Sequence, residues 1–388
     1  MANIDGEVAP GYEPVREAFA ANFEQHGEVG AAFALYRHGQ KVVDLWGGVA
    51  DEETGRPWQE DTLQLVFSTT KGATAIAANL LAQRGQLDLD APVGEYWPEF
   101  KAEGKERIPV RWLLSHRAGL PVVDTPVSPE ECFAWTPMVD ALAAQRPVWE
   151  PGTAHGYHAL TYGHLVGEVV RRVTGRSVGR FFAEEVAGPL GLDFFIGLPE
   201  EHEPRVSRLI QQAPLGAPPD LEQVPEAVRE MVERMFGPGS LMTRALSPTS
   251  APIDFNSRAC HAAEIPAANG ITSARSLARL YAAQIGEVDG VRILDDASVA
   301  RVSEEQSNGP DQVLVVPTRF GLGFFLSSSF SPLMGPTSFG HAGAGGSLGF
   351  ADPETGVGYG YVMNKMQANL SGDPRTLGLV AAVKACLR

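Results

Sequence analysis

The 388-residue sequence has few basic residues, few cysteines and no long apolar run. Its 31 lysines and arginines are outnumbered by 47 acidic residues, which gives a formal net charge of −16. A protein that binds nucleic acid neutralises phosphates with a basic patch, and no basic run occurs here. No apolar stretch reaches the roughly 20 residues that a membrane span requires. The composition therefore argues against a nucleic-acid partner and against a membrane-spanning segment.

The three cysteines, Cys132, Cys260 and Cys386, are too few and too widely spaced for a disulfide framework or a zinc ribbon. The first residues lack the basic and apolar regions of a secretory signal peptide, so we expect a cytoplasmic location. Hydrophobic residues make up 44% of the chain and charged residues 20%, which indicates a globular protein with a substantial core. The 42 glycines and 29 prolines indicate many turns.

Strand and helix patterns divide the chain into ends and a middle. Apolar runs predict strands near both ends, at residues 31–36, 41–46, 320–326, 347–350 and 357–363. Helical spacing of apolar residues predicts helices at 71–84, 160–174, 226–236, 273–285 and 376–387. Residues 199–225 are rich in proline and charge and are interpreted as a surface excursion. We expect one domain built from residues 1–90 and 265–388, with a mostly helical domain inserted at 91–264.

The segment Ser68-Thr69-Thr70-Lys71 stands at the beginning of the first strong helix. Residues three apart share a helix face, so the side chains of Ser68 and Lys71 can touch. Free N–H groups at a helix start favour the oxyanion that forms when a serine attacks a carbonyl. The flanking sequence is apolar, and burial lowers the pKa of a lysine, which lets it act as a base toward the hydroxyl. Alternatively, the segment is an ordinary helix start with Ser68 or Thr69 as its cap.

Two further segments are candidates for the same site. His155-Gly156-Tyr157-His158-Ala159 predicts a tight turn that exposes Tyr157 before a helix, where a phenol can take or give a proton. The alternative is a tyrosine packed at a loop–helix junction. The glycine-rich residues 340–349 would let the backbone approach a ligand closely, and an N–H group there could complete an oxyanion hole with that of Ser68. A plain glycine-rich turn is the alternative.

A competing nucleophile is excluded by its context. Residues 345–349 match Gly-x-Ser-x-Gly, which in α/β-hydrolases needs a strand before the serine, a helix after it, and a downstream histidine. A predicted strand follows Ser347 instead, and no histidine lies beyond it. Ser347 is therefore not expected to be the nucleophile.

Metal and cofactor chemistry find little support in the sequence. His155, His158 and His164 lie close together but lack the carboxylate pattern of a metal site. His116, within the stretch Leu-Leu-Ser-His-Arg-Ala-Gly-Leu at 113–120, is interpreted as a residue that organises a loop. The sequence has neither a phosphate-binding loop nor a convincing dinucleotide motif, so we expect no metal and no cofactor.

Taken together, these residues resemble the serine β-lactamase-like superfamily, and most closely its family VIII carboxylesterases. That family shares the fold of class C β-lactamases and D-alanyl-D-alanine peptidases. The resemblance covers nearly the whole chain and rests on Ser68 to Lys71, residues 113–120, Tyr157, and His341-Ala342-Gly343. It implies an α+β fold, in which an antiparallel sheet flanked by helices is joined by the inserted, mostly helical domain, with the active site between the two domains.

The resemblance also assigns roles to residues. It implies Ser68 as the acyl-forming nucleophile and Lys71 with Tyr157 as the proton-transfer pair. The oxyanion hole would combine the backbone N–H of Ser68 with that of Ala344. The other candidates for oxyanion or substrate binding are His341, Gly343 and His158.

Two departures from the class C pattern bear on the substrate. The Tyr-x-Asn motif is Tyr157-His158-Ala159 here, and the Lys-Thr-Gly motif is His341-Ala342-Gly343, so an asparagine and a lysine that hold a β-lactam are absent. Histidine is mostly neutral at pH 7, which weakens the case for an anionic substrate. We therefore expect a serine carboxylesterase for small short-chain or aryl esters. An amide hydrolase (β-lactamase, D-aminopeptidase or amide-oligomer hydrolase), an acyltransferase and a non-catalytic binding protein stay open, and the sequence predicts no oligomeric state.

Overall fold

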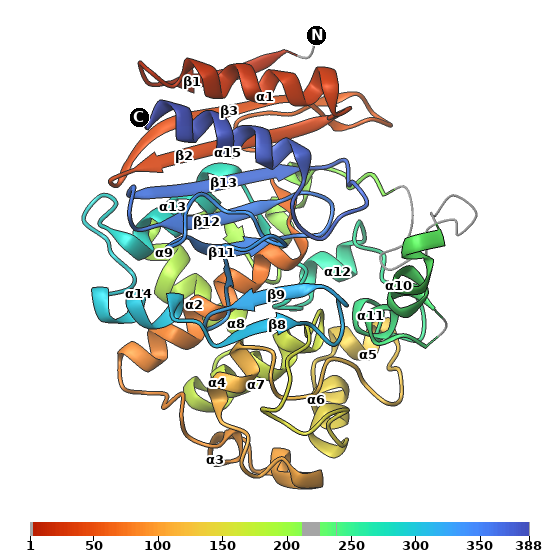
Figure 1. Ribbon diagram of the computed structural model, residues 1–388. Helices are drawn as coiled ribbons and strands as arrows, with labels where there is room; N and C mark the ends of the chain where they lie inside the picture. The colour runs from red at the N-terminus through yellow and green to blue at the C-terminus, as the bar shows by residue number, and fades with distance from the viewer. Residues whose placement is uncertain (1–2, 212–225, 238, 388) are drawn as a thin grey trace.

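A ten-stranded antiparallel sheet dominates the computed structural model, which describes residues 3–211, 226–237 and 239–387 (Figure 1). Its strands run in the order β1 (Ile4–Val8), β3 (Gln40–Asp51), β2 (Gly30–Arg37), β13 (Val357–Met363), β12 (Leu348–Asp352), β11 (Phe339–Ala342), β10 (Phe325–Leu326), β9 (Pro317–Phe320) and β8 (Ser307–Pro310), and β4 (Arg56–Pro57) pairs with β3. A smaller sheet has the order β5 (Gln64–Leu65), β7 (Ile271–Thr272) and β6 (Phe194–Phe195).

The centre of the large sheet joins the two ends of the chain. Strand β2 pairs with β13 from Ala31 opposite Met363 to Arg37 opposite Val357. Successive side chains of a strand point to opposite faces, and both faces of β2 are buried. Its odd-numbered residues from 31 to 35 enter one hydrophobic cluster, and its even-numbered residues from 32 to 36 enter the other. This is why the sequence of β2 is a continuous apolar run.

Helices cover both faces of the sheet. On one face α1 (Glu13–Gln25) and α15 (Pro374–Cys386) lie together over the N- and C-terminal strands (Figure 1). Val15, Phe19, Leu379 and Val383 are buried there. On the other face α13 (Ala274–Ile285) packs against β2, β12 and β13. The side chain of Ser273 caps α13 by accepting the N–H of Ser276, as its position at the helix start predicts.

The rest of the molecule below the sheet is mostly helical. Between β5 and α13 the structure has α2 (Thr70–Gln83), α3 (Val93–Tyr96), α4 (Val110–Leu114), α5 (Pro129–Phe133), α6 (Thr136–Ala144), α7 (Thr161–Thr174), α8 (Val178–Phe182), α9 (Gly188–Leu190), α10 (Glu226–Phe236), α11 (Leu241–Leu246) and α12 (Arg258–Ala262). Helix α14 (Asp296–Ser303) follows α13. Short 3₁₀ turns are η1 (Phe67–Thr69), η2 (Pro98–Gly104) and η4 (Glu200–Arg205), and η3 (Ala183–Ala187) is a π turn.

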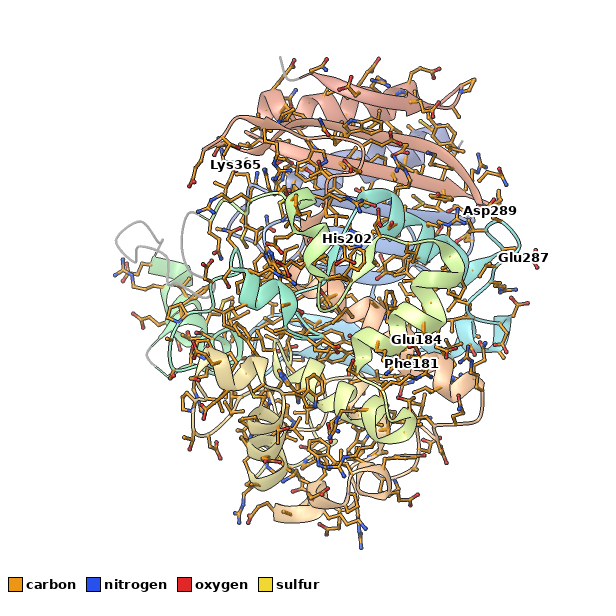
Figure 2. The ribbon with its side chains drawn as sticks, turned by 180° about the vertical axis from the view of Figure 1, so that it is seen from behind. Phe181, Glu184, His202, Glu287, Asp289 and Lys365 are labelled. Carbon is orange, nitrogen blue, oxygen red and sulfur yellow. The ribbon has the colours of Figure 1, made fainter. Side chains whose placement is uncertain are left out.

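Ion pairs lie on the rear surface of this helical part. Seen from behind, the segment that carries Phe181 and Glu184 lies below the strands (Figure 2). The guanidinium of Arg176 stacks on the ring of Phe181, 4.8 Å from its centroid, and pairs with Glu184 at 2.8 Å.

Within the described ranges, no helix combines the length and the apolar character needed to cross a bilayer.

Most strands and helices predicted from periodicity are present, with three differences. The predicted strand at 320–326 is interrupted, because β9 ends at Phe320 and β10 begins at Phe325, with Gly323 at a φ of 91° between them. The glycine-rich segment begins as a strand, since β11 extends to Ala342. Residues 206–210 pack against Leu63 and Lys365 and are no excursion, whereas 212–225 lie outside the described residues. The proposed domain limits stay predictions, although every strand of the large sheet comes from residues 4–57 and 307–363.

A buried charge cluster joins α15 to the glycine-rich segment. Arg375 donates to both carboxylate oxygens of Glu28, at 3.0 and 3.1 Å, and binds Asp373 at 2.8 Å. It also donates to the carbonyl of Gly345, while the hydroxyl of Tyr361 donates to Glu28. All three charged side chains are 3% exposed or less, and burial raises the pKa of Glu28 to about 7. The cluster therefore holds the backbone at Gly345 from inside the protein.

Replacing Arg375 with methionine should destabilise the fold strongly. The variant leaves Glu28 and Asp373 buried without their cation, which typically costs about 3–5 kcal/mol. Urea unfolding followed by circular dichroism measures the loss. Arg292→Met is the matched control, because Arg292 pairs with an Asp296 that is 93% exposed, and such pairs contribute about 1 kcal/mol or less. An equal loss in the two variants would show that the buried cluster contributes nothing special.

Candidate active site

Ser68 lies in η1, directly before α2, and η1 packs against β11. It is the only residue of the Ser68–Lys71 segment that is not buried. The preceding Phe67 has a φ of 44°, a strained backbone conformation for a bulky residue. This conformation is held from both sides, because Val66 donates its N–H to Gly270 at 2.9 Å and Thr70 donates its hydroxyl to the carbonyl of Phe67 at 2.5 Å.

Lys71 is fully buried and points at Ser68. Its Nζ lies 3.1 Å from Ser68 Oγ, 2.7 Å from the carbonyl oxygen of Ala159 and 3.0 Å from that of Ala267. Burial lowers the pKa of Lys71 well below its usual value. A neutral amine has two N–H donors and one lone pair. The two carbonyls use both donors, and this leaves the lone pair for the hydroxyl proton of Ser68.

Tyr157 contributes its hydroxyl group to the same place. The phenol is hydrogen-bonded to Ser68, and Lys71 Nζ lies 4.8 Å from the centroid of the Tyr157 ring. The ring stacks on Phe325, at a centroid distance of 5.8 Å, and on Phe320, at 6.2 Å. Burial raises the pKa of Tyr157. The structure thus brings Ser68, Lys71 and Tyr157 together, with a buried amine that releases its proton easily and a buried phenol that keeps its own.

The glycine-rich segment packs against the start of α2. Ser347 Oγ donates to the carbonyl of Val66 at 2.8 Å and lies 3.1 Å from Thr69 Oγ1. A side chain at Gly343 would overlap the Val66 carbonyl oxygen, so this approach requires glycine. Ser347 is fully buried and tied to backbone and hydroxyl partners, as a structural residue would be. Ala344 follows Gly343 in the turn that packs against Val66 and Thr69, and no protein acceptor for its N–H is found in the described part of the chain.

His341 lies beside Tyr157 and presents an unpaired nitrogen. Its ring centroid is 6.0 Å from that of Tyr157 and 4.6 Å from that of Phe325. Nδ1 donates to the carbonyl of Ala342 at 2.7 Å, which makes Nε2 an acceptor in the neutral ring. Nε2 is buried and has no partner in the described structure. Burial and the nearby Lys71 lower the pKa of His341 well below its usual value, so the ring is neutral.

His158 does not fit the predicted role in substrate binding. Its Nε2 accepts the N–H of Leu120 at 3.0 Å, its Nδ1 donates to the carbonyl of Gly156 at 2.7 Å, and the ring is fully buried. Both nitrogens are occupied by the backbone, and burial lowers its pKa to about 3, so it is a neutral structural residue. The interpretation of His116 as a loop-organising residue agrees with its contacts, since its carbonyl and Nδ1 accept the N–H groups of Gly156 and His158 at 3.0 and 3.1 Å.

The structure adds one residue that the sequence pattern did not suggest. Asp311, in the turn between β8 and β9, accepts the backbone N–H of Tyr157 at 3.0 Å. A single aspartate after Gly309-Pro310 indicates a turn and nothing about a partner 154 residues away. No group of three histidine, cysteine or acidic side chains in the described ranges is arranged to hold a metal ion.

The chain is similar to known proteins over nearly its whole length. The family model described as Beta-lactamase matches residues 15–383. The chain is 37% identical over 379 residues to "Esterase/beta-lactamase LipL" of Mycobacterium tuberculosis, covering 95% of this chain and 84% of that protein. The solved structure of a family VIII carboxylesterase is 41% identical, with a TM-score of 0.88, and the match covers 99% of this chain and 100% of that one. A penicillin-binding protein homologue from Caulobacter crescentus is 37% identical with a TM-score of 0.86, over 99% and 100% of the two chains.

Proposed function

The chain belongs to the beta-lactamase family of serine hydrolases, and from this premise we propose that it hydrolyses small carboxylic esters through an acyl-enzyme on Ser68. One observation carries the proposal above the others. Ser68 Oγ is held between a buried lysine, 3.1 Å away, and the hydroxyl of a buried tyrosine. This is the arrangement that nucleophilic catalysis by a serine needs, because a base must receive the hydroxyl proton as the carbonyl is attacked.

The acylation step assigns different roles to the two proton-transfer groups. Neutral Lys71 takes the proton of Ser68, and Oγ forms a bond to the ester carbonyl carbon. The negative charge then moves to the carbonyl oxygen, where the N–H groups of Ser68 and Ala344 would stabilise it. The bond to the alcohol oxygen breaks as Tyr157 gives that oxygen its proton, and the Lys71 ammonium restores the phenol. The opposite pKa shifts of the two groups favour this division into base and acid.

Deacylation repeats the same transfers with water in place of the alcohol. Lys71 removes a proton from a water molecule, the resulting hydroxide attacks the acyl carbonyl, and Ser68 Oγ leaves with the returned proton. Every group ends in its starting protonation state. The scheme requires no metal and no cofactor, since each proton acceptor and donor belongs to the chain.

A neutral ester suits the site better than an anionic lactam. The position of the lactam-binding lysine in the class C motif is occupied by His341, whose buried ring is neutral. At the position of the motif's asparagine, Ala159 has no polar side-chain group, and its carbonyl binds Lys71. Neither group can pair with a carboxylate. The unpaired Nε2 of His341 is an acceptor, and we assign it to a hydroxyl or other donor group of the substrate or its leaving alcohol.

A direct comparison of substrates tests this preference. We expect kcat/KM for p-nitrophenyl acetate to exceed that for the β-lactam nitrocefin by about 100-fold or more, because the lactam carboxylate finds no cation. Both reactions are followed by absorbance on the same preparation, with a Ser68→Ala sample as the background control. Hydrolysis of nitrocefin at an equal or greater rate would contradict the preference for esters and make β-lactams the favoured substrate class. The name of the relative "Esterase/beta-lactamase LipL" includes both activities.

A further inference from the structure

The backbone on both sides of Tyr157 is tied down by three consecutive N–H groups. Gly156 and His158 donate to His116, and between them Tyr157 donates to Asp311 Oδ1 at 3.0 Å. No side chain of the Ser68–Lys71 segment takes part in these bonds. The position of the phenol therefore depends on two residues that lie outside the three catalytic motifs, and Asp311 holds the tyrosine itself.

Asp311 is built as an acceptor for backbone groups. The residue is 2% exposed. Oδ1 accepts the N–H groups of Tyr157, Val313 and Leu314, at 3.0, 2.8 and 2.9 Å, and Oδ2 accepts the hydroxyl of Thr318 at 3.0 Å. A buried carboxylate is costly unless such donors surround it. The N–H groups of Val313 and Leu314 belong to the turn that begins at Asp311, and these two donors are enough to cap it. The bond to Tyr157 is not needed for the turn and is an additional function of the carboxylate.

The hairpin that carries Asp311 is joined to the tyrosine segment at several points. Gln312 donates its N–H to the carbonyl of His155 at 3.0 Å, and His155 Nε2 lies 3.0 Å from Thr318 Oγ1. In the same turn Val315 has a φ of 60°, which is strained for a β-branched residue. Strain of this kind persists only where surrounding contacts enforce it and is concentrated at functional sites. The next strand, β9, ends at Phe320, whose ring stacks on Tyr157.

We propose that Asp311 is the positioning residue for Tyr157: its carboxylate fixes the tyrosine backbone so that the phenol oxygen stays within reach of Ser68 and of the leaving alcohol. The inference rests on the proposed function. Asp311 touches neither substrate nor reacting atoms and acts only through Tyr157. Proton transfer demands a short, aligned contact, and a displacement of about 1 Å lowers a catalytic rate by about 100-fold.

Two substitutions separate position from charge. Asp311→Asn keeps an oxygen for the three N–H groups and removes the negative charge, whereas Asp311→Ala removes both. We expect kcat for p-nitrophenyl acetate to fall about 100-fold in Asp311→Ala with KM nearly unchanged, and to fall less than about threefold in Asp311→Asn. Rates are expressed per site that reacts with a fluorophosphonate, which counts only folded molecules. Asp295→Ala is the matched control, because Asp295 also accepts a backbone N–H, that of Ser298 at 2.7 Å, but at the start of α14.

The pH profile gives a second readout, which reports whether the charge of Asp311 lies close to the phenol of Tyr157. The charge of Asp311 raises the pKa of Tyr157, so its loss in Asp311→Asn should move the alkaline limb of kcat/KM to lower pH. The other titratable groups around Tyr157 stay in place in this variant, namely Lys71, His116, His158, Tyr162 and His341.

The outcomes distinguish this inference from the proposed function. Full kcat per reactive site in Asp311→Ala, with an inactive Ser68→Ala enzyme, overturns the role of Asp311 alone. Activity in Ser68→Ala overturns the proposed function. If Asp311→Ala fails to fold, Asp311→Ser decides, because its hydroxyl can still accept an N–H group of Val313 or Leu314 in the turn. Full kcat per reactive site in this variant contradicts the inference, and a fall of about 100-fold with KM nearly unchanged supports it.

Discussion

Ser68→Ala is expected to lower kcat for p-nitrophenyl acetate by at least about 10⁴-fold, because it removes the hydroxyl that forms the proposed acyl-enzyme. The hydroxyl is a small, partly accessible group, so its removal should leave the fold and the unfolding midpoint unchanged. Stopped-flow measurement should show that the burst of p-nitrophenol in the wild-type enzyme is absent from the variant. Retention of the burst would mean that the nucleophile lies elsewhere.

Ser347 provides the control for that experiment. It is the serine of the Gly-x-Ser-x-Gly sequence, but its Oγ is buried and bonded to Val66 and Thr69. Mass spectrometry of the fluorophosphonate-treated protein should find the adduct on the peptide with Ser68 and leave the peptide with Ser347 unmodified. Ser347→Ala should keep its burst, with kcat reduced by about tenfold or less through a looser contact between the glycine-rich turn and α2.

Replacing Lys71 by methionine or by arginine should reduce kcat/KM by about 10³-fold in both variants. Methionine is chosen because it fills the buried space left by the lysine stem. Arginine keeps a positive charge, but its pKa is too high for it to accept a proton at neutral pH. Comparing the two variants therefore distinguishes a role of Lys71 as a base from a role as a positive charge alone. An arginine variant with near wild-type activity would show that Lys71 contributes charge and not proton transfer.

The pH dependence of the wild-type enzyme supplies the control for the lysine variants. Only the neutral amine can act as a base, so kcat/KM should rise with pH as Lys71 loses its proton, and burial moves this rise below the usual pKa of a lysine. At higher pH the rate should fall as Tyr157 ionises and can no longer protonate the alcohol. The acid limb should be absent in Lys71→Met, because no proton needs to leave position 71.

The local part of the site could be predicted from the sequence because helix geometry determines it. Residues three apart at a helix start must be neighbours, and the structure places Lys71 Nζ 3.1 Å from Ser68 Oγ. The residues before and after this segment are mostly apolar, and this predicts that Lys71 is buried. The role of Tyr157 was inferred from the family resemblance, since its distance along the chain contains no geometric information.

The remaining parts depend on packing that no local pattern encodes. The bond from Tyr157 to Asp311 joins a loop of the helical part to a hairpin of the sheet, so the sequence near either residue indicates only a turn. His158 resembled a ligand-binding histidine because it follows Tyr157, but the path of the chain near Leu120 gives its Nε2 a backbone partner. The sequence does not predict strand β11, because Gly340 weakens its short pattern, although this glycine lets the backbone of Gly349 and Phe350 approach.

The pairing of β2 with β13 has a consequence for how the protein is made. A nascent chain emerges from the ribosome at roughly 5–20 residues per second, and β2 is complete long before residue 357 has been added. Until then the apolar β2 has an open edge, the kind of surface that invites aggregation. Such non-local pairing also slows folding, because a long loop must close before the contact forms. The Ser68 segment is thus synthesised early, but the glycine-rich turn that packs against it is added only much later, after the whole helical part.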